Sequence, residues 1–470
     1  MKRRDFFKNT SLAALTATVL SPFDLLAGNM ADRERARTKK AKNIVFMVSD
    51  GMSVGTLTMA GLLLQRKEGR QSHWLDLFQQ EGVRRSLMDT ASANSLVTDS
   101  AAASSSWGGG FRVNNGSLNV GPDGKEHRPI LQKFKAAGKA VGCVTTVPIT
   151  HATPAGFCIN NNKRGDQSEI ALQYLPLKFD VMLGGGQEYF DPAKRKDKRD
   201  VFADFRKAGY EVVEDRAGLM AGTAAGARPL LGVFHEDGLP YELDRKQDPA
   251  LMTRIPSLAE MTSQAISRLR RSPNGFVMQV EAGKVDWAAH ANDAGALVYD
   301  QIAFDEAVKV ALDFAREDKE TLVVITTDHG NANPGLFSGA STNANFDRLQ
   351  HFKRTNDWVL KNVERSFTAS RLIEHIEAAQ GIAISAEEAR ILLSHFNGSA
   401  EDGLYNPGKL PFRALAEIQM KYTNVGFGSM DHSGDYVEVT MFGPGSDLLK
   451  PFIKNTDLHY LMLNAAEVQA

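Results

Sequence analysis

The sequence predicts an α/β protein with a doubly wound, mainly parallel central sheet, helices on both faces and a helical insertion. Two observations support this fold class. Short apolar runs alternate with helical patterns along most of the chain, as in sheets that helices cover on both faces. One later region, about 335–424, carries helical patterns without strands between them. At 470 residues, of which 43% are hydrophobic, the chain is long enough to bury a large core.

Five apolar runs are predicted to be strands of this sheet, because short continuous runs are typical of strands buried on both faces. They are Ile44–Val48, Ala140–Val147, Phe179–Leu183, Phe276–Val280 and Leu322–Thr326. Helices are predicted between them where apolar residues recur at helical spacing. These helices are Ile130–Ala137, Ser257–Arg270 and Leu297–Ala315.

The region 335–424 is interpreted as an insertion that decorates the sheet. It holds helical patterns at Ser366–Ala379 and Ala386–His395. The second pattern follows Ser385-Ala-Glu-Glu388, the sequence of a capping box. The composition of this insertion does not indicate what it does.

The N-terminus resembles an export signal. Residues 1–29 have a basic start, a weakly apolar middle and small residues near Ala27, and Arg3-Arg4-Asp5-Phe6-Phe7-Lys8 resembles the twin-arginine motif. A basic amphipathic surface helix is the alternative. The middle of the segment is too short and too polar for a stable membrane span. We expect a charged linker at 30–42, a single domain at 43–470, and a periplasmic or secreted protein.

Charge and cysteine content narrow the function classes. The net charge of −1 gives no electrostatic argument for binding nucleic acid or an anionic membrane. Cys143 and Cys158 lie in apolar stretches of the sequence. They are interpreted as two buried thiols, and a single disulfide is the alternative. Because the chain has only these two cysteines, any metal site must use histidines and carboxylates.

Acidic residues follow three of the predicted strands. Asp50, Glu281 and Asp328 come at the ends of apolar runs. In a parallel sheet the carboxyl ends of the strands meet at one edge, where ligands bind. Three acids gathered there would repel one another unless a cation neutralised them. One Asp after a strand is ordinary turn chemistry, but three favour a metal site.

Histidines support a metal site. Asp286 and His290 are four residues apart and share one helix face, His329 follows Asp328, and His432 comes from far along the chain. Carboxylate and imidazole ligands without thiolates suit zinc with an open coordination position, which is the catalytic arrangement.

The stretch Leu96–Gly110, LVTDSAAASSSWGGG, offers two interpretations. Thr98, Asp99 and Ser100 can each cap a helix, and the three glycines would end it. One interpretation is a short capped helix on the surface. The other is a serine held at a positive helix end, where an anion or a nucleophile would be stabilised.

The ordered set of motifs SDGM, TDSAAA, THATPAG, LGGG, VEAGKVDWAAH, TTDHG and DHSG resembles the alkaline phosphatases. The resemblance covers most of residues 42–334 and 429–466 and implies that family's doubly wound α/β fold. It implies two zinc ions and one magnesium ion. One zinc would be held by Asp286, His290 and His432, the second by Asp50, Asp328, His329 and in part Ser100, and magnesium by Asp50, Thr153 and Glu281.

The resemblance also implies an activity. Ser100 would be the nucleophile that forms a phosphoserine intermediate, and Arg164 would fork onto the substrate phosphate. His151 and Trp287 stand at positions that vary in the family, and a subset of bacterial members has the same pair. We expect His151 to lie beside the metal ligands and Trp287 to line the site or to be a core residue. Broad hydrolysis of phosphate monoesters and a homodimer are expected.

Two other classes of function are alternatives to a phosphomonoesterase. A phosphodiesterase, sulfatase or phosphoglycerate mutase would share the superfamily. A sulfatase needs Cys or Ser in a C/S-x-P-x-R setting that TDSAAASSS lacks, and diesterases usually carry a threonine nucleophile without a third metal. An exported metal-binding protein without turnover would have no need for both Ser100 and Arg164.

Overall fold

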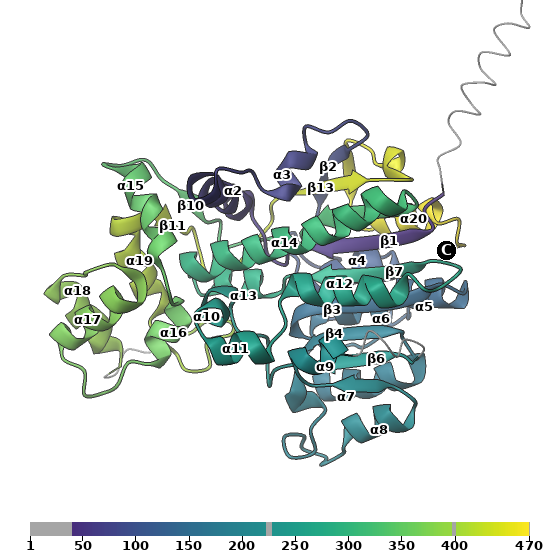
Figure 1. Cartoon of the computed structure of the whole chain (residues 1–470), viewed down its shortest axis with the longest axis horizontal. Helices are drawn as coiled ribbons and strands as arrows, with labels where there is room; N and C mark the ends of the chain where they lie inside the picture. The colour runs from purple at the N-terminus through teal and green to yellow at the C-terminus, as the bar shows by residue number, and fades with distance from the viewer. Residues whose placement is uncertain (1–39, 222–227, 397–400, 470) are drawn as a thin grey trace, which may run out of the picture. The chain divides into compact units, whose positions relative to one another are not determined.

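The computed structural model describes residues 40–221, 228–396 and 401–469. The predicted export signal and most of the predicted linker lie outside the described residues. The described chain from Lys40 onward forms one compact unit built on a ten-stranded sheet (Figure 1).

The sheet has the strand order β14-β2-β13-β8-β1-β7-β3-β4-β6-β5. Its strands are β1 (Asn43–Val48), β2 (Arg84–Asp89), β3 (Ala140–Pro148), β4 (Val181–Gly185), β5 (Glu211–Val213), β6 (Leu230–Val233), β7 (Phe276–Glu281), β8 (Thr321–Thr326), β13 (Val437–Phe442) and β14 (Phe452–Lys454). From β8 to β5 every pair is parallel, and β13 runs antiparallel to both of its neighbours. The predicted fold class is confirmed.

The sheet separates two hydrophobic cores, because successive strand side chains point to opposite faces. In β1, Val45 and Met47 join one core, whereas Ile44, Phe46 and Val48 join the other. The first core includes residues of α2 (Val54–Glu68), α12 (Leu258–Leu269) and α14 (Ala294–Asp318). The second includes residues of α4 (Ser100–Gly109), α5 (Ile130–Ala136), α6 (Ala152–Cys158) and α20 (Asp457–Ala465). Helices therefore cover both faces, as predicted.

All five predicted strands are present, as β1, β3, β4, β7 and β8, with ends that differ by at most two residues. The three helices predicted between them are α5, α12 and α14. Cys143 and Cys158 are both buried and free, with their Sγ atoms 3.5 Å apart. Of the two alternatives for the cysteines, the structure therefore has the buried thiols.

The region 335–424 is helical, as predicted, and Figure 1 shows its helices gathered together beside the sheet. They are α15 (Thr342–Asp347), α16 (Asn356–Lys361), α17 (Ala369–Gln380), α18 (Ala386–His395) and α19 (Phe412–Thr423). The capping box of α18 is confirmed, since Ser385 and Glu388 each bind the backbone N–H of the other. A two-residue antiparallel pair, β10 (Gly335–Leu336) with β11 (Val425–Gly426), closes the base of the insertion.

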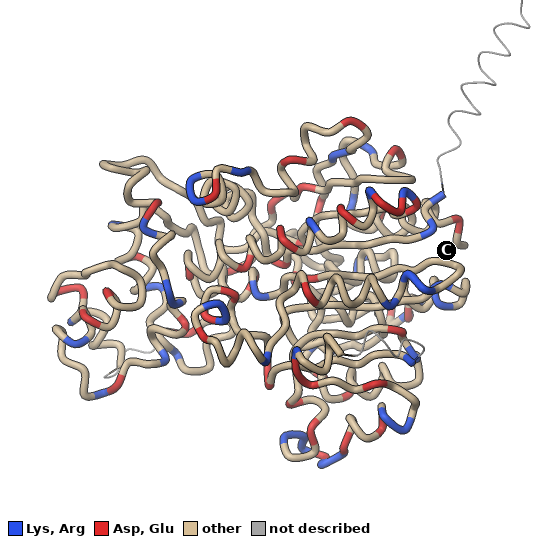
Figure 2. The backbone as a smooth tube through the Cα atoms, viewed as in Figure 1, with Lys and Arg blue, Asp and Glu red and all other residues tan. Residues whose placement is uncertain are grey.

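Acidic groups from the sheet domain hold the insertion in place. The Asp244 carboxylate accepts hydrogen bonds from the backbone N–H and the hydroxyl of Thr355, at 3.1 and 2.6 Å. The carboxylate of Asp293 accepts one from the backbone N–H of Asn356, at 2.6 Å. Figure 2 shows basic and acidic residues interspersed over both the sheet and the insertion, in keeping with the small net charge.

Candidate active site and metal centre

Three neighbouring strands bring the predicted acids together. Glu281 is the last residue of β7 and pairs with Val48, and Asp50 follows β1 by two residues. Asp328 follows β8 by two residues, and β8 is the other neighbour of β1. Because β7, β1 and β8 are parallel, their carboxyl ends form one edge of the sheet. The predicted acidic edge is present.

The acids and histidines of this edge form three groups whose ligand atoms lie within 4.8 Å of one another. The groups are Asp286, His290 and His432; Asp50, Asp328 and His329; and Asp50, His151 and Glu281. The first two contain the acids and histidines of the two predicted zinc ligand sets. In the third, His151 joins Asp50 and Glu281, two of the residues predicted to hold magnesium, and the hydroxyl of the remaining one, Thr153, donates to Asp50 at 3.3 Å.

Two of the acids, Asp50 and Glu281, are destabilised in their ionised forms by burial and by neighbouring carboxylates. Asp50 is completely buried, and burial followed by the charges of Asp328 and Asp286 raises its pKa well above the usual value. Burial, with a contribution from Asp328, raises the pKa of Glu281 to about 7. A bound cation would remove this repulsion.

Buried carboxylate oxygens without hydrogen-bond partners give a direct test of whether metal ions fit. Among the described residues, one oxygen in each of four acids has no such partner. These oxygens are Asp50 Oδ1, Glu281 Oε1, Asp286 Oδ2 and Asp328 Oδ2. Buried polar atoms are rarely left in this state unless an ion or water binds them. The donor set therefore fits divalent cations.

The histidines are oriented as metal ligands. The Nδ1 atoms of His290, His432 and His329 lie 2.7, 2.9 and 3.3 Å from backbone carbonyl oxygens, which can only accept a hydrogen bond. Each neutral ring then carries its proton on Nδ1 and turns the lone pair of Nε2 towards the acids. The Nε2 atoms of His290 and His432 are 3.0 Å apart, an arrangement that a shared cation would stabilise.

Asp286 lies between these histidines. Its carboxylate oxygens are 3.4 Å from Nε2 of His290 and 3.5 Å from Nε2 of His432. Burial opposes ionisation of Asp286, but the nearby histidines hold its pKa below the usual value. Asn331 donates to the same carboxylate at 2.7 Å. Asn331, which lies in the two-residue strand β9 (Gly330–Asn331), was not a predicted site residue, because a single asparagine carries no distinctive spacing.

Ser100 is the first residue of α4, and its hydroxyl lies 3.4 Å from Nε2 of His329. Of the three possible caps, Asp99 is the one that acts, since its side chain accepts from the N–H of Ala102 at 2.9 Å. Every residue of α4 is buried. The surface-helix alternative is therefore wrong, because the helix packs behind the acidic edge.

The prediction that all three glycines form the stop is wrong in part. Gly110, with φ 82°, ends α4, but Gly108 and Gly109 belong to the helix. A Cβ atom on Gly108 would lie 2.0 Å from the carbonyl oxygen of Gly156 in α6. The glycines therefore let the backbones of α4 and α6 touch, which fixes the helix that carries Ser100.

Arg164 also lies at this site. Its guanidinium donates to Asp99 at 3.0 Å and to Nε2 of His151 at 3.1 Å. Asp99 in turn precedes Ser100, so the arginine is held beside the start of α4. Trp287 is buried, and its ring meets that of His151 edge to face at 6.2 Å.

Tyr405 is a residue of the site that the sequence did not predict. It comes from the insertion, and its hydroxyl lies 3.0 Å from Nε2 of His151. Its ring stacks on Trp287, with centroids 4.6 Å apart and planes 23° apart. No motif surrounds Tyr405, so only the fold reveals it.

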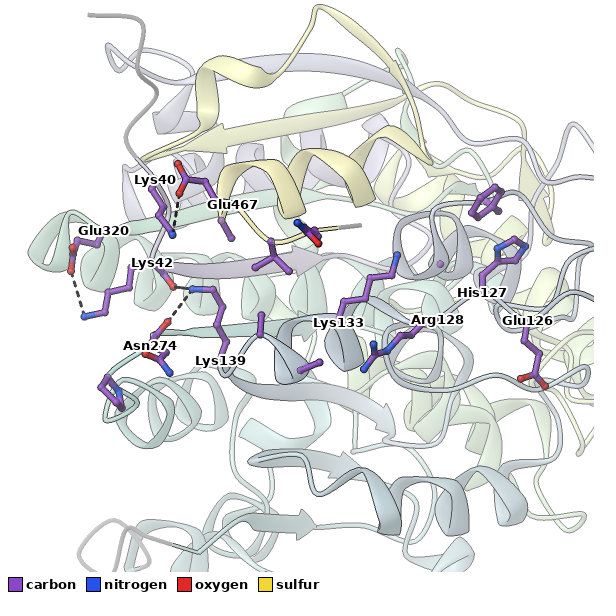
Figure 3. Close-up of a pocket in the computed structure, with 18 of the residues that line it drawn as sticks. Lys40, Lys42, Glu126, His127, Arg128, Lys133, Lys139, Asn274, Glu320 and Glu467 are labelled. Atoms are coloured by element: carbon purple, nitrogen blue, oxygen red, sulfur yellow. Dashed lines mark hydrogen bonds and ion pairs between the residues drawn. The ribbon is translucent and has the colours of Figure 1, made fainter. Parts of the chain in front are cut away.

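A cavity of about 1130 Å³ lies at the other edge of the sheet (Figure 3). It is lined in part by Lys42, Lys139, Asn274 and Glu320, each of which lies one or two residues before the start of a strand. The ammonium group of Lys139 donates to the backbone carbonyls of Lys42 and Asn274, and Lys42 pairs with Glu320. These cations are engaged by the fold itself, away from the acidic edge.

A mainly parallel sheet that gathers acids and histidines around a buried serine is typical of a metal-dependent hydrolase. The chain matches the family model described as "Alkaline phosphatase" over residues 41–468. It is 30% identical to alkaline phosphatase 3 of Bacillus subtilis over 454 residues, which is 95% of this chain and 94% of that protein. The crystal structure of the Thermus thermophilus alkaline phosphatase superposes with a TM-score of 0.84, at 32% identity and 92% of each chain.

A cold-active alkaline phosphatase from a psychrophilic Shewanella species superposes with a TM-score of 0.76, at 25% identity over 90% of this chain and 99% of that one. The chain belongs to the alkaline phosphatase family. It is an enzyme, a phosphoric monoester hydrolase of that family.

Proposed function

We propose that the protein is an exported alkaline phosphatase that uses a phosphoserine intermediate on Ser100, two zinc ions and one magnesium ion. The observation that carries this proposal is the position of the Ser100 hydroxyl. It lies at the start of a buried ten-residue helix, 3.4 Å from His329, beside buried carboxylate oxygens without hydrogen-bond partners. The reaction releases inorganic phosphate and an alcohol.

The residues divide between two kinds of site. Mixed histidine and carboxylate donors suit zinc, and these are the two groups that contain His290 with His432 and His329. Oxygen donors suit magnesium, and the hydroxyl of Thr153 with the carboxylates of Asp50 and Glu281 would supply them. When bound, the metal ions supply positive charge that favours the Ser100 alkoxide and offsets the charge of the phosphate.

His151 is proposed to lie beside the magnesium ligands without binding the ion. Arg164 can only donate, so Nε2 of His151 must accept its hydrogen bond. A neutral His151 then carries its proton on Nδ1, which leaves that nitrogen without a lone pair for a metal ion. Burial, together with Arg164, lowers the pKa of His151 to about 3, which keeps the ring neutral.

Ser100 acts as the nucleophile. Its hydroxyl loses a proton to solvent, and its oxygen bonds to phosphorus as the bond from phosphorus to the alcohol oxygen breaks. The leaving alkoxide takes a proton from solvent and departs as the alcohol. Water then attacks the phosphoserine, which restores the Ser100 hydroxyl and releases phosphate. Arg164 binds two non-bridging oxygens through its planar guanidinium, and the positive end of α4 adds to the stabilisation.

The test is a comparison of three ester classes on the metal-loaded protein at alkaline pH. We expect a chromogenic phosphate monoester to be hydrolysed far faster than a diester or a sulfate ester. Turnover should stop in chelator, return with zinc plus magnesium, and fall by orders of magnitude in Ser100→Ala. A wide preference for the diester or the sulfate ester would show that the proposed substrate class is wrong.

Export and assembly complete the proposal. The motif Arg3-Arg4-Asp5-Phe6-Phe7-Lys8 supports a twin-arginine signal and a periplasmic or secreted enzyme, and the family resemblance supports a homodimer. Within residues 40–221, 228–396 and 401–469, no helix is long and apolar enough to cross a membrane. Cell fractionation of a chain with lysines at positions 3 and 4 tests the export route.

A further inference from the structure

The insertion contributes one side chain, Tyr405, to the phosphate-binding side of the site. Its hydroxyl lies 3.0 Å from Nε2 of His151 and accepts from Arg164 at 3.5 Å. Arg164 itself donates to the same His151 nitrogen at 3.1 Å. The three side chains therefore form a closed triangle, in which Tyr405 is the only member that comes from outside the sheet domain.

The ring of Tyr405 is fixed by the aromatic side chains around it. It stacks on Trp287 at 4.6 Å and meets His290 edge to face at 5.7 Å. The backbone of Tyr405 has φ 60°, a left-handed conformation that a bulky side chain rarely adopts. Such a conformation persists only where the surrounding structure specifies it.

The loop that carries Tyr405 is braced internally. The Asn406 side chain donates to the carbonyl oxygens of Glu401 and Leu410, at 3.2 and 2.9 Å, and accepts from the N–H of Leu410 at 2.9 Å. The Glu401 carboxylate accepts from the N–H of Arg413 at the start of α19, at 2.9 Å. Together with the contacts of Asp244 and Asp293 to α16, this gives the hydroxyl of Tyr405 a defined position.

We propose that Tyr405 is a positioning residue, whose hydroxyl fixes the pair formed by His151 and Arg164 so that the guanidinium is preorganised for phosphate. The inference rests on the proposed function, because it takes Arg164 as the group that binds the substrate phosphate. It gives the helical insertion a role, which is to complete the wall of the site next to the arginine. Preorganisation of this kind strengthens binding by reducing the ordering that the ligand must impose.

The test compares Tyr405→Phe with Tyr422→Phe. Tyr405→Phe keeps the ring and removes only the hydroxyl. Tyr422 lies in the same insertion, and its hydroxyl binds Glu388 at 2.8 Å, so its variant is a matched control for loss of a tyrosine hydroxyl. Inorganic phosphate binding to the zinc- and magnesium-loaded proteins is measured by calorimetry, and kcat and KM are measured with a chromogenic monoester.

We expect Tyr405→Phe to weaken phosphate binding about fivefold, the effect of one ordinary hydrogen bond, and to raise KM while kcat changes by less than about twofold. Tyr422→Phe should behave as the wild type. In an Arg164→Ala background, Tyr405→Phe should change phosphate binding little, because its effect passes through the arginine. Equal melting temperatures of Tyr405→Phe and the wild type would exclude a general loss of structure.

Unchanged phosphate affinity in Tyr405→Phe would overturn the inference, as would an equal loss in the Arg164→Ala background. If the wild type binds phosphate without hydrolysing a monoester, the proposed function fails, while the binding data still decide the role of Tyr405. If the wild type does not bind phosphate, both are refuted. Should Tyr405→Phe melt lower, its loss of phosphate affinity must still disappear in the Arg164→Ala background for the inference to stand.

Discussion

Glu281 is a buried carboxyl group whose replacement by glutamine tests the electrostatics of the acidic edge. The side chain is completely buried, Thr145 donates to one of its oxygens, and its Oε1 has no hydrogen-bond partner among the described residues. Burial, with Asp328 adding to it, raises the pKa of Glu281 to about 7. The perturbation is therefore the removal of one ionisable group from a crowded acidic site.

The sign of the effect follows from the two pKa values. The folded value of about 7 exceeds the value of 4.5 for an ordinary glutamate, so the folded protein holds the proton more tightly. The stability from this group is present below pH 4.5 and is lost as the pH rises towards 7. At 1.36 kcal/mol for each pH unit, the loss amounts to roughly 3 kcal/mol. Glutamine at position 281 does not titrate and avoids this loss.

The assay is denaturant unfolding of metal-free protein across pH 4.5–8. We expect the stability of Glu281→Gln relative to the wild type to grow by roughly 3 kcal/mol between pH 4.5 and pH 7.5. Glu374→Gln, on the exposed surface of α17, should show no such growth. With zinc and magnesium bound, the sign should reverse, because the variant lacks a proposed ligand. A relative stability that does not vary with pH would refute the reasoning.

Two further predictions concern α4 and the first proposed zinc site. Gly108→Ala should lower the free energy of unfolding by about 1–3 kcal/mol, measured by denaturation, since its Cβ atom would collide with the backbone of Gly156; Gly335→Ala, where contacts are ordinary, should cost less. His290→Ala should bind one zinc ion fewer per chain than the wild type by elemental analysis; an unchanged zinc content would remove His290 from the proposed ligands.

The strands that the sequence predicted are those whose local pattern alone determines their structure. β1, β7 and β8 are continuous apolar runs because both of their faces are buried. β2 has the sequence Arg-Arg-Ser-Leu-Met-Asp and is exposed at three of its positions, so its pattern resembles a loop. It becomes a strand because β13 pairs with it antiparallel and β14 pairs with it in parallel. Such long-range pairing is not visible in a local window.

The residues of the candidate site also differ in whether local sequence or long-range contacts determine their positions. The acids and histidines could be predicted because each lies at a strand end or at helical spacing within a motif, where local sequence determines the direction of the side chain. Tyr405 could not, since its position depends on the fold of the whole insertion and on the contacts of Asp244 and Asp293 with Thr355 and Asn356. Tyr405 is recognised only by its contacts with His151 and Trp287 in the folded chain.

Asp99 links the helix that carries Ser100 to Arg164, because its carboxylate binds both. One carboxylate oxygen accepts from the N–H of Ala102 and caps α4, at 2.9 Å. The other accepts from Arg164 at 3.0 Å and from the N–H of Gly116 at 3.0 Å. Because one rigid carboxylate binds both groups, the helix that carries the proposed nucleophile and the arginine proposed to bind phosphate hold a fixed relation. The capping residue therefore fixes the position of Arg164 relative to Ser100 as well as the start of the helix.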